Sequence, residues 1–148
     1  MKRIGIFTVA LLLGACASNS EDMSLSADDS LGDSFFEDMM SGGRFKGAAL
    51  DAALKAAEKH PMGSEKNPVR ADMPEGQRAY LQRLRCANGK PPNYQRAGNI
   101  GPGVFGSIVD LYEVRCDGST PAEAEVYMDM YFPGHVEQRT VPGFLLTP

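Results

Sequence analysis

The strictest pattern in the chain is an alternation of residue types between Ala122 and Phe132. One set consists of Ala124, Val126, Met128, Met130 and Phe132, and the other of Glu123, Glu125, Tyr127, Asp129 and Tyr131. Successive side chains of a β-strand point to opposite faces, so this period of two predicts a strand with one face in a core and one face in water. Such a strand needs a second layer to cover its apolar face.

An alanine-rich stretch, residues 46–59, is predicted to supply that layer as a helix. Alanine is the strongest helix former, and Leu50 and Leu54 lie four residues apart on one face. Pro61 and Gly63 follow and end the helix. Its apolar stripe is narrow, so we expect the helix to lie close against a sheet.

Three further segments have the composition of strands. Pro68 to Met73 begins with proline, which suits an edge strand, and Pro74-Glu75-Gly76 is predicted to turn the chain into a second strand over Gln77 to Cys86. Ser107 to Cys116 is predicted as the third strand, and Asp117 to Pro121 as the turn into the fourth. The expected fold is α+β, with one helix packed on a mainly antiparallel sheet of about four strands.

The charge of the 148-residue chain, formally −4, is concentrated ahead of residue 44. Serine, aspartate, glutamate, glycine and methionine prevail in residues 17–43, and no Lys or Arg follows the first three residues until Arg44. Such a segment cannot bury enough surface to offset its ordering entropy, which predicts an acidic flexible tether over residues 16–43; an acidic interaction tail is the alternative. Residues 44–148 form one small domain without the basic surface that nucleic-acid binding requires.

The beginning of the chain has the three parts of a secretory signal. Met1-Lys2-Arg3 is cationic, Ile4 to Leu13 is apolar, and Gly14-Ala15-Cys16 ends the run with small residues and a thiol. A ten-residue helix is about 15 Å long, half of the roughly 30 Å core of a bilayer. The segment therefore indicates export, not a membrane span.

The residues Leu13-Gly14-Ala15-Cys16 resemble the lipobox of bacterial lipoprotein precursors. The resemblance implies a signal peptide over residues 1–15 and a mature chain that begins at Cys16, whose acyl chains anchor the protein in a membrane. Ala17 is not the aspartate that retains members of this family in the inner membrane, which implies the outer membrane, facing the periplasm. The alternative is cleavage after Ala15-Cys16-Ala17, which would release a soluble protein beginning at Ser18.

Lipidation of Cys16 would leave Cys86 and Cys116 as a pair in an oxidising compartment, which predicts a disulfide. Its contribution to stability would be about 3 to 4 kcal/mol in the chain-entropy model. Both cysteines end predicted strands, so the bond requires either that these strands run in parallel or that one cysteine lies beyond its strand. Two cysteines and two distant histidines do not form the close ligand pairs of a zinc site, so no metal is expected.

The residues Gly101, Gly103 and Gly106 have the spacing of a nucleotide-binding loop, G-x-G-x-x-G. A dinucleotide-binding loop opens a helix, whereas Ser107 to Tyr112 continues as a strand. No nucleotide and no other cofactor is therefore expected. The stretch is instead predicted to be a disulfide-closed lip of the sheet where a partner binds.

Basic residues cluster near the second predicted strand: Arg78, Arg83, Arg85 and Lys90. They either form a patch for an acidic partner, such as a glycan or a lipid phosphate, or pair across the sheet with Glu113, Glu125 or Asp129. We expect the cross-strand pairs.

These observations predict a lipid-anchored envelope protein with a non-catalytic domain. That domain would bind or support an envelope protein or the cell wall. The candidate surface comprises Arg83, Arg85, Gly101, Gly103, Phe105, Tyr127, Tyr131 and His135. One alternative is a small periplasmic enzyme that uses His135 with Asp129 or Asp110; another is an inhibitor of cell-wall hydrolases. Segments 62–70, 127–131 and 134–137 are similar to small uncharacterised exported proteins of Gram-negative bacteria.

Overall fold

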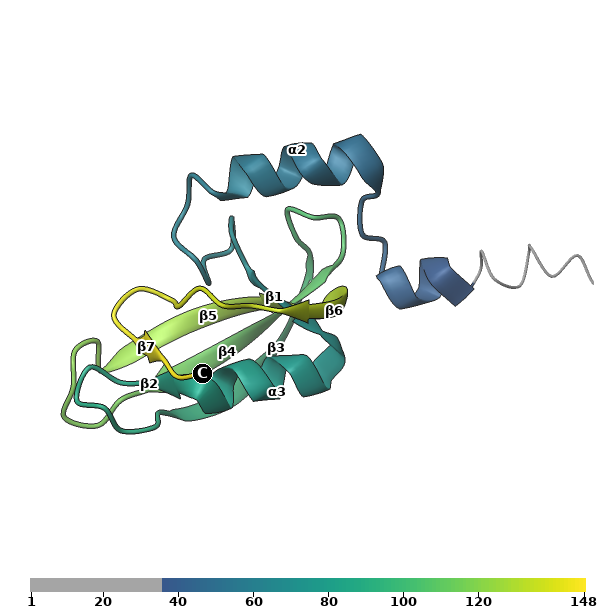
Figure 1. Cartoon of the computed structure of the whole chain (residues 1–148). Helices are drawn as coiled ribbons and strands as arrows, with labels where there is room; N and C mark the ends of the chain where they lie inside the picture. Colours follow the sequence, from purple (N-terminus) through teal and green to yellow (C-terminus); the bar gives the residue numbers. More distant parts are fainter. Residues whose placement is uncertain (1–35) are drawn as a thin grey trace, which may run out of the picture.

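A computed structural model of the chain describes residues 36–148, which contain a mixed five-stranded sheet, a small two-stranded sheet and helices on two sides (Figure 1). The helices and strands are α2 (Gly47–Ala57), β1 (Val69–Asp72), α3 (Met73–Arg83), β2 (Leu84–Arg85), β3 (Asn93–Pro102), β4 (Ile108–Arg115), β5 (Glu123–Asp129), β6 (Tyr131–Val136) and β7 (Leu145–Leu146). A helical turn over residues 36–41 precedes α2. The fold is α+β, as predicted.

The main sheet has the strand order β3-β4-β5-β1-β6. Its pairings are antiparallel except for that between β5 and β1, which is parallel. The small sheet pairs β2 with β7 in antiparallel orientation. The predicted strand over residues 107–116 is confirmed as β4, and the apolar set of the predicted fourth strand supplies Val126 and Met128 to the core.

The prediction of a strand over Gln77 to Cys86 was wrong, because most of this segment is helix α3. The buried residues Gln77, Tyr80, Leu81 and Leu84 have the i, i+3, i+4, i+7 spacing of a helix face. Pro74 is in the first turn of α3, where its missing N–H costs no hydrogen bond, and so the predicted Pro-Glu-Gly turn is the start of a helix. α3 covers one face of the main sheet and encloses the larger core cluster with it (Figure 1).

Two strand predictions also required correction. β1 lies between β5 and β6, so it is not an edge strand. Pro68, which has no backbone N–H, lies just before the strand and therefore does not interrupt its hydrogen bonds to the neighbouring strands. The predicted strand over Ala122 to Phe132 is divided at Met130 into β5 and β6. The carboxylate of Asp129 accepts a hydrogen bond from the backbone N–H of Tyr131, 2.9 Å away, at this break.

The glycine-containing stretch is the end of a hairpin, because residues 93–102, for which no strand was predicted, form strand β3 and pair with β4. Loop 103–107 joins the two strands and carries Phe105, which is fully buried against Phe132 and α2. α2 therefore packs on this loop and on β6, at one end of the sheet (Figure 1). The helix forms where it was predicted, but the expectation that it covers the apolar face of the sheet was wrong, because α3 provides that layer. The loop is not a disulfide-closed lip, since Cys116 follows the opposite end of β4.

The predicted disulfide between Cys86 and Cys116 is present, with Cα atoms 5.8 Å apart. Both cysteines lie beyond their strands, β2 and β4, so the second of the two predicted geometries applies. Both are buried within the larger core cluster. The bond thus connects the small sheet to the main sheet.

The predicted signal peptide, the lipobox with Cys16 and most of the predicted tether lie outside the described residues. Among residues 36–148, no helix is both long enough and apolar enough to cross a bilayer.

Candidate functional site

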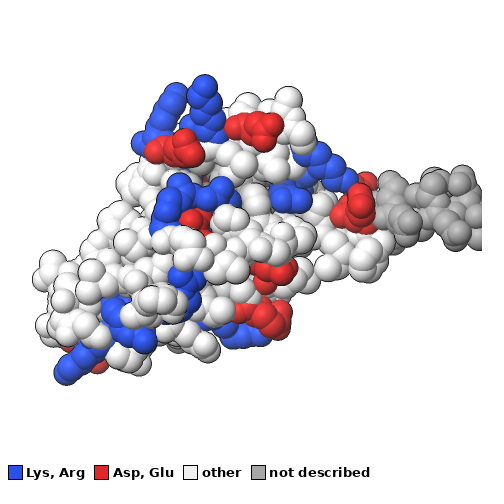
Figure 2. All heavy atoms as spheres, in the orientation of Figure 1, with Lys and Arg blue, Asp and Glu red and all other residues white. Residues whose placement is uncertain are grey.

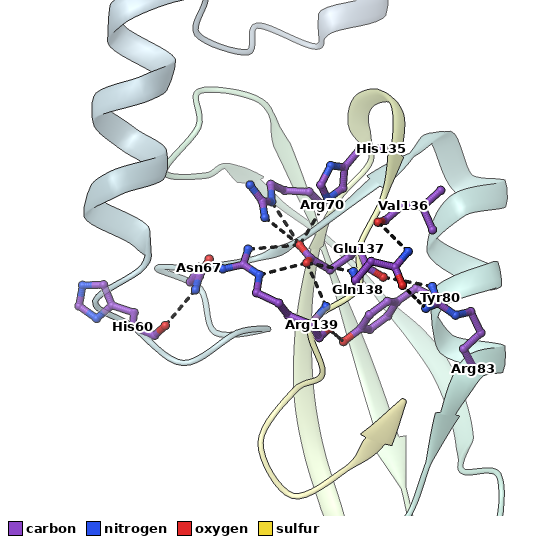
Figure 3. Close-up of polar contacts among 10 residues, drawn as sticks. All are labelled: His60, Asn67, Arg70, Tyr80, Arg83, His135, Val136, Glu137, Gln138 and Arg139. Carbon is purple, nitrogen blue, oxygen red and sulfur yellow. Dashed lines mark hydrogen bonds and ion pairs between the residues drawn. The ribbon is translucent and has the colours of Figure 1, made fainter. Parts of the chain in front are cut away.

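Polar side chains from three elements meet around Glu137, which follows β6 (Figure 3). Arg70 comes from β1, Tyr80 and Arg83 come from α3, and His135 lies on β6. We call Arg70, His135, Glu137 and Arg139 the Glu137 cluster. Its members come together because β1 is the neighbour of β6 in the sheet and α3 packs beside both strands.

Two arginines hold the Glu137 carboxylate. Arg70 donates from Nε and Nη2 to Oε2, at 3.3 and 3.0 Å, and Arg139 donates from Nε to Oε1 at 3.1 Å and from Nη2 to Oε2 at 3.3 Å. The backbone N–H groups of Gln138 and Arg139 also donate to Oε1, each at 3.2 Å. Burial alone would raise the pKa of Glu137, but the hydrogen bonds from Arg139 and Arg70 outweigh it and lower the pKa to about 2.

α3 fixes the segment that carries this carboxylate. The Tyr80 hydroxyl donates to the backbone oxygen of Arg139 at 3.0 Å, and burial raises the pKa of Tyr80, which keeps the phenol protonated. Arg83 donates from Nη1 to the backbone oxygen of Glu137 at 3.1 Å and from Nε to that of Thr147 at 3.0 Å. Arg83 is therefore a structural link between α3 and two C-terminal segments.

A small hollow of about 90 Å³ opens beside the cluster. It is lined by Arg70, Gly76, Ala79, Tyr80, Arg83, His135, Val136 and Glu137. His135 Nε2 lies 3.4 Å from Glu137 Oε2 at its wall. Two arginines, Arg70 and Arg83, line the hollow with one carboxylate, and Arg139 binds the same carboxylate, so the neighbourhood carries a positive charge. The hollow has room for one small group such as a carboxylate or a phosphate.

A second buried acid, Asp129, lies beneath loop 103–107. Ser107 and Asp129 are both fully buried, and the Ser107 hydroxyl donates to the Asp129 carboxylate. Burial raises the pKa of Asp129, and the hydrogen bonds from Ser107 and the backbone of Tyr131 only partly offset it. Because loop 103–107 covers the pair, we interpret it as an internal anchor for that loop.

Asp110, the other acid suggested by the sequence, has its own cation. Its carboxylate is buried and accepts a hydrogen bond from Arg96 Nη2 of β3, at 2.7 Å. His135 approaches neither Asp110 nor Asp129 within hydrogen-bonding distance, and its acidic neighbour is Glu137. The proposed pairs of His135 with Asp129 or Asp110 were therefore wrong.

The expected cross-strand pairs of the basic residues were also wrong. Arg78 binds Glu75 within α3 at 2.6 Å, Arg83 binds backbone oxygens, and Arg85 donates to the backbone oxygens of Gln82 and Leu84. Glu113 is instead close to Arg115. The cause is the helix: residues predicted to face a neighbouring strand belong to α3 or follow it.

Of the predicted partner surface, only Arg83 and His135 line the hollow. Gly101 and Gly103 lie at the hairpin end, Phe105 is fully buried, and Tyr127 and Tyr131 lie on β5 and β6. Glu137, Arg70 and Arg139 were not predicted as a group. Glu137 and Arg139 are two residues apart in extended chain, and this spacing indicates that their side chains lie on the same side. No local pattern in the sequence connects them to Arg70.

Within residues 36–148, no group of three or more His, Cys, Asp or Glu side chains is placed to hold a metal ion. Comparisons with protein-family models, with curated proteins and with solved structures found no match to this chain.

Proposed function

We propose that the chain is a lipid-anchored protein of the bacterial cell envelope, facing the periplasm, whose domain binds an anionic group at the Glu137 cluster without chemical conversion. The binding proposal rests on the hydrogen bonds that Arg70 and Arg139 make to Glu137. Each donates Nε and Nη2 to one carboxylate, and Nη1 of each has no hydrogen-bond partner among the described residues. The carboxylate thus holds two guanidinium groups in place while leaving donors for a second anion.

The charge around the site favours a small anion over a polyanion. Figure 2 shows basic side chains scattered over this face of the molecule, with acidic side chains between them. A continuous basic surface, as nucleic-acid binding requires, is not seen on this face. Phosphates of lipopolysaccharide and carboxylates of peptidoglycan peptides share the chemistry that this site recognises, and both occur in the proposed compartment.

The test is a titration of the isotope-labelled chain from Cys16 onward with inorganic phosphate, followed by nuclear magnetic resonance of the arginine Nε–Hε groups. We expect the signals of Arg70 and Arg139 to shift and saturate, and the Arg115 signal to stay in place. Arg70→Gln should weaken phosphate binding about tenfold, the loss expected for one charge-assisted hydrogen bond. Arg115→Gln is the matched control, because Arg115 is an exposed strand arginine that pairs with Glu113 and Glu123.

Two further titrations distinguish the sources of the anion. Lipopolysaccharide offers phosphates, and soluble peptidoglycan peptides offer carboxylates, so the ligand that displaces phosphate from the site identifies its class. Equal phosphate affinity in the original chain and in folded Arg70→Gln would contradict the proposal. Shifts confined to residues outside the cluster would do the same.

The approach of His135 to Glu137 favours one alternative, a hydrolase in which His135 is the base. Glu137, with a pKa of about 2, is a weak base, so its part in this alternative would be to orient the imidazole. The alternative predicts that peptidoglycan fragments are cleaved by the original chain and not by His135→Gln, as followed by mass spectrometry. Binding without new fragments supports the non-catalytic proposal.

The lipid anchor has a separate test. Mass spectrometry of the protein from membranes should find an N-terminal peptide that begins at Cys16 and carries a diacylglyceryl group. An unmodified N-terminus at Ser18 would contradict the anchor without affecting the anion site.

A further inference from the structure

Exposed apolar side chains gather where the described part of the chain begins. Phe36 and Met39, one turn apart in the helical segment 36–41, expose 57% and 58% of their surface. A hollow of about 330 Å³ adjoins Phe36, and its lining includes Met40, Arg44, Lys46 and Pro133. We call Phe36, Met39, Met40 and Pro133 the Phe36 patch. Large exposed apolar side chains in one place usually mark a contact with a partner or a membrane.

The segment is fastened to the domain, so the patch has a defined direction. The backbone N–H of Phe45 donates to the carbonyl oxygen of Phe105 at 2.8 Å, and the Arg44 guanidinium lies 4.8 Å from the centre of the Phe132 ring. Lys46 pairs with Asp38 at 3.0 Å across the turn. These contacts attach residues 38–46 to loop 103–107 and β6.

The charges of this segment cancel. Glu37 and Asp38 are balanced by Arg44 and Lys46. A neutral segment is neither attracted to nor repelled by an anionic membrane surface over long range, so apolar contact would have to provide the binding.

We propose that the Phe36 patch lies in the interface of the bilayer to which Cys16 is anchored; this inference rests on the proposed lipid anchor. Phe36 lies twenty residue steps after Cys16, a span of at most about 70 Å even when fully extended. The anchor keeps the patch at a high local concentration near the membrane, and under that condition a few weak apolar contacts are enough. The Phe36 patch then fixes the orientation of the domain relative to the membrane. The Glu137 cluster, built from β1, β6 and residues 137–139, is not part of this membrane contact.

The experiment exploits the lack of tryptophan in the chain, because a single introduced tryptophan reports on one site. The chain from Cys16 onward is coupled through its Cys16 thiol to a maleimide lipid in vesicles of three parts phosphatidylethanolamine to one part phosphatidylglycerol, with bromine-labelled acyl chains. Cys86 and Cys116 are joined in the disulfide and do not react. Met39→Trp should lose about half of its fluorescence to the bromines, as expected for side chains roughly 5 to 10 Å below the surface.

Leu145→Trp is the matched control, because Leu145 is 57% exposed but lies on β7. It should keep its fluorescence, and high salt should not reverse the quenching of Met39→Trp. Equal quenching in both variants, or none in Met39→Trp, would overturn the inference. So would a dimer of the uncoupled chain in sedimentation that Phe36→Ser abolishes, since a second copy would then cover the patch.

The chemical coupling separates this inference from the lipid anchor. If Cys16 carries no lipid in the native protein, mass spectrometry shows it whatever the vesicles show. If Cys16 is acylated but Met39→Trp is not quenched, the anchor stands and the membrane contact of the Phe36 patch fails.

Discussion

Two buried carboxylates on the strands that flank β1, Asp129 at the end of β5 and Glu137 just after β6, have opposite electrostatic properties. Glu137 exposes 4% of its surface and Asp129 none, so burial favours the neutral acid in both. Glu137 nevertheless has a pKa of about 2, whereas the pKa of Asp129 is raised. The difference lies in their partners, since Arg70 and Arg139 hold Glu137, and a hydroxyl and one backbone N–H hold Asp129.

Glu137 therefore belongs to a candidate binding site, whereas Asp129 is an internal anchor. The Glu137 carboxylate is ionised, bound to guanidinium groups and next to a hollow, so its neighbourhood can attract an anion. Asp129 is covered by loop 103–107, and its hydrogen bonds hold that loop and the break between β5 and β6. By burial alone, Asp129 would be the better candidate for a functional residue, because it is less exposed than Glu137.

The largest expected effect follows from removing the charge of Glu137. Glu137→Gln keeps the shape but leaves Arg70, largely buried, without its counterion, and loss of one partner of a buried pair costs about 4 kcal/mol. The free energy of unfolding, measured with urea, should fall by that amount. Glu113→Gln is the control, because Glu113 is half-exposed and its contact with Arg115 is long, at 3.5 Å. A similar loss in both variants would show that the guanidinium groups do not depend on Glu137.

The two acids should also give opposite dependences of stability on pH. The pKa of Glu137 falls from 4.5 to about 2 on folding, so its stabilisation is complete above pH 4.5 and is lost as the pH falls through about 2. The loss is about 3 kcal/mol. Asp129, with a raised pKa, favours the folded state below the unfolded value of 3.8 and loses that contribution as the pH rises through its folded pKa.

Urea unfolding between pH 2 and 6 of the original chain, Glu137→Gln and Asp129→Asn measures both contributions. The gap between the original chain and Glu137→Gln should close toward low pH. The gap to Asp129→Asn should change in the opposite sense. Parallel curves for all three proteins would contradict the assignment.

A smaller effect is expected at neutral pH when Asp129 is replaced by asparagine. The new amide oxygen can accept the hydrogen bond from the backbone N–H of Tyr131, and its NH₂ group can donate to the Ser107 oxygen, so only the Ser107 hydroxyl hydrogen loses its acceptor. Because burial already disfavours the charge of Asp129, we expect a loss of about 1 kcal/mol or less. Asp129→Leu, which cannot bind Ser107 or Tyr131, should cost clearly more in the same unfolding experiment.

The sequence predicted those parts of the fold whose signals are local. The alternation in β5, the strand β4 and the alanine-rich helix α2 were confirmed, and the even number of remaining cysteines led to the correct disulfide. α3 was mistaken for a strand because Pro74 and Gly76 are typical of turns, although a proline also suits the first turn of a helix. The i, i+3, i+4, i+7 spacing of Gln77, Tyr80, Leu81 and Leu84 is that of a helix and was the correct signal.

The candidate site could be predicted only in part. His135 was named as a site residue, but its partner was expected to be Asp129 or Asp110. The actual partner, Glu137, depends on Arg70, which is far away in sequence and reaches the site only because β1 inserts between β5 and β6. Long-range pairing of this kind leaves no periodic trace in the sequence.

The smallest expected effect is that of His135→Ala on stability. His135 Nε2 lies 3.4 Å from Glu137 Oε2, about a third of its side chain is exposed, and the carboxylate already has Arg70 and Arg139. A weak and partly solvated contact of this kind contributes less than about 0.5 kcal/mol, so the midpoint of urea unfolding should scarcely move. If His135→Ala instead destabilised the domain as much as Glu137→Gln, the imidazole would be part of the clamp on Glu137. In that case the cluster would resemble the Asp129 anchor more than a binding site.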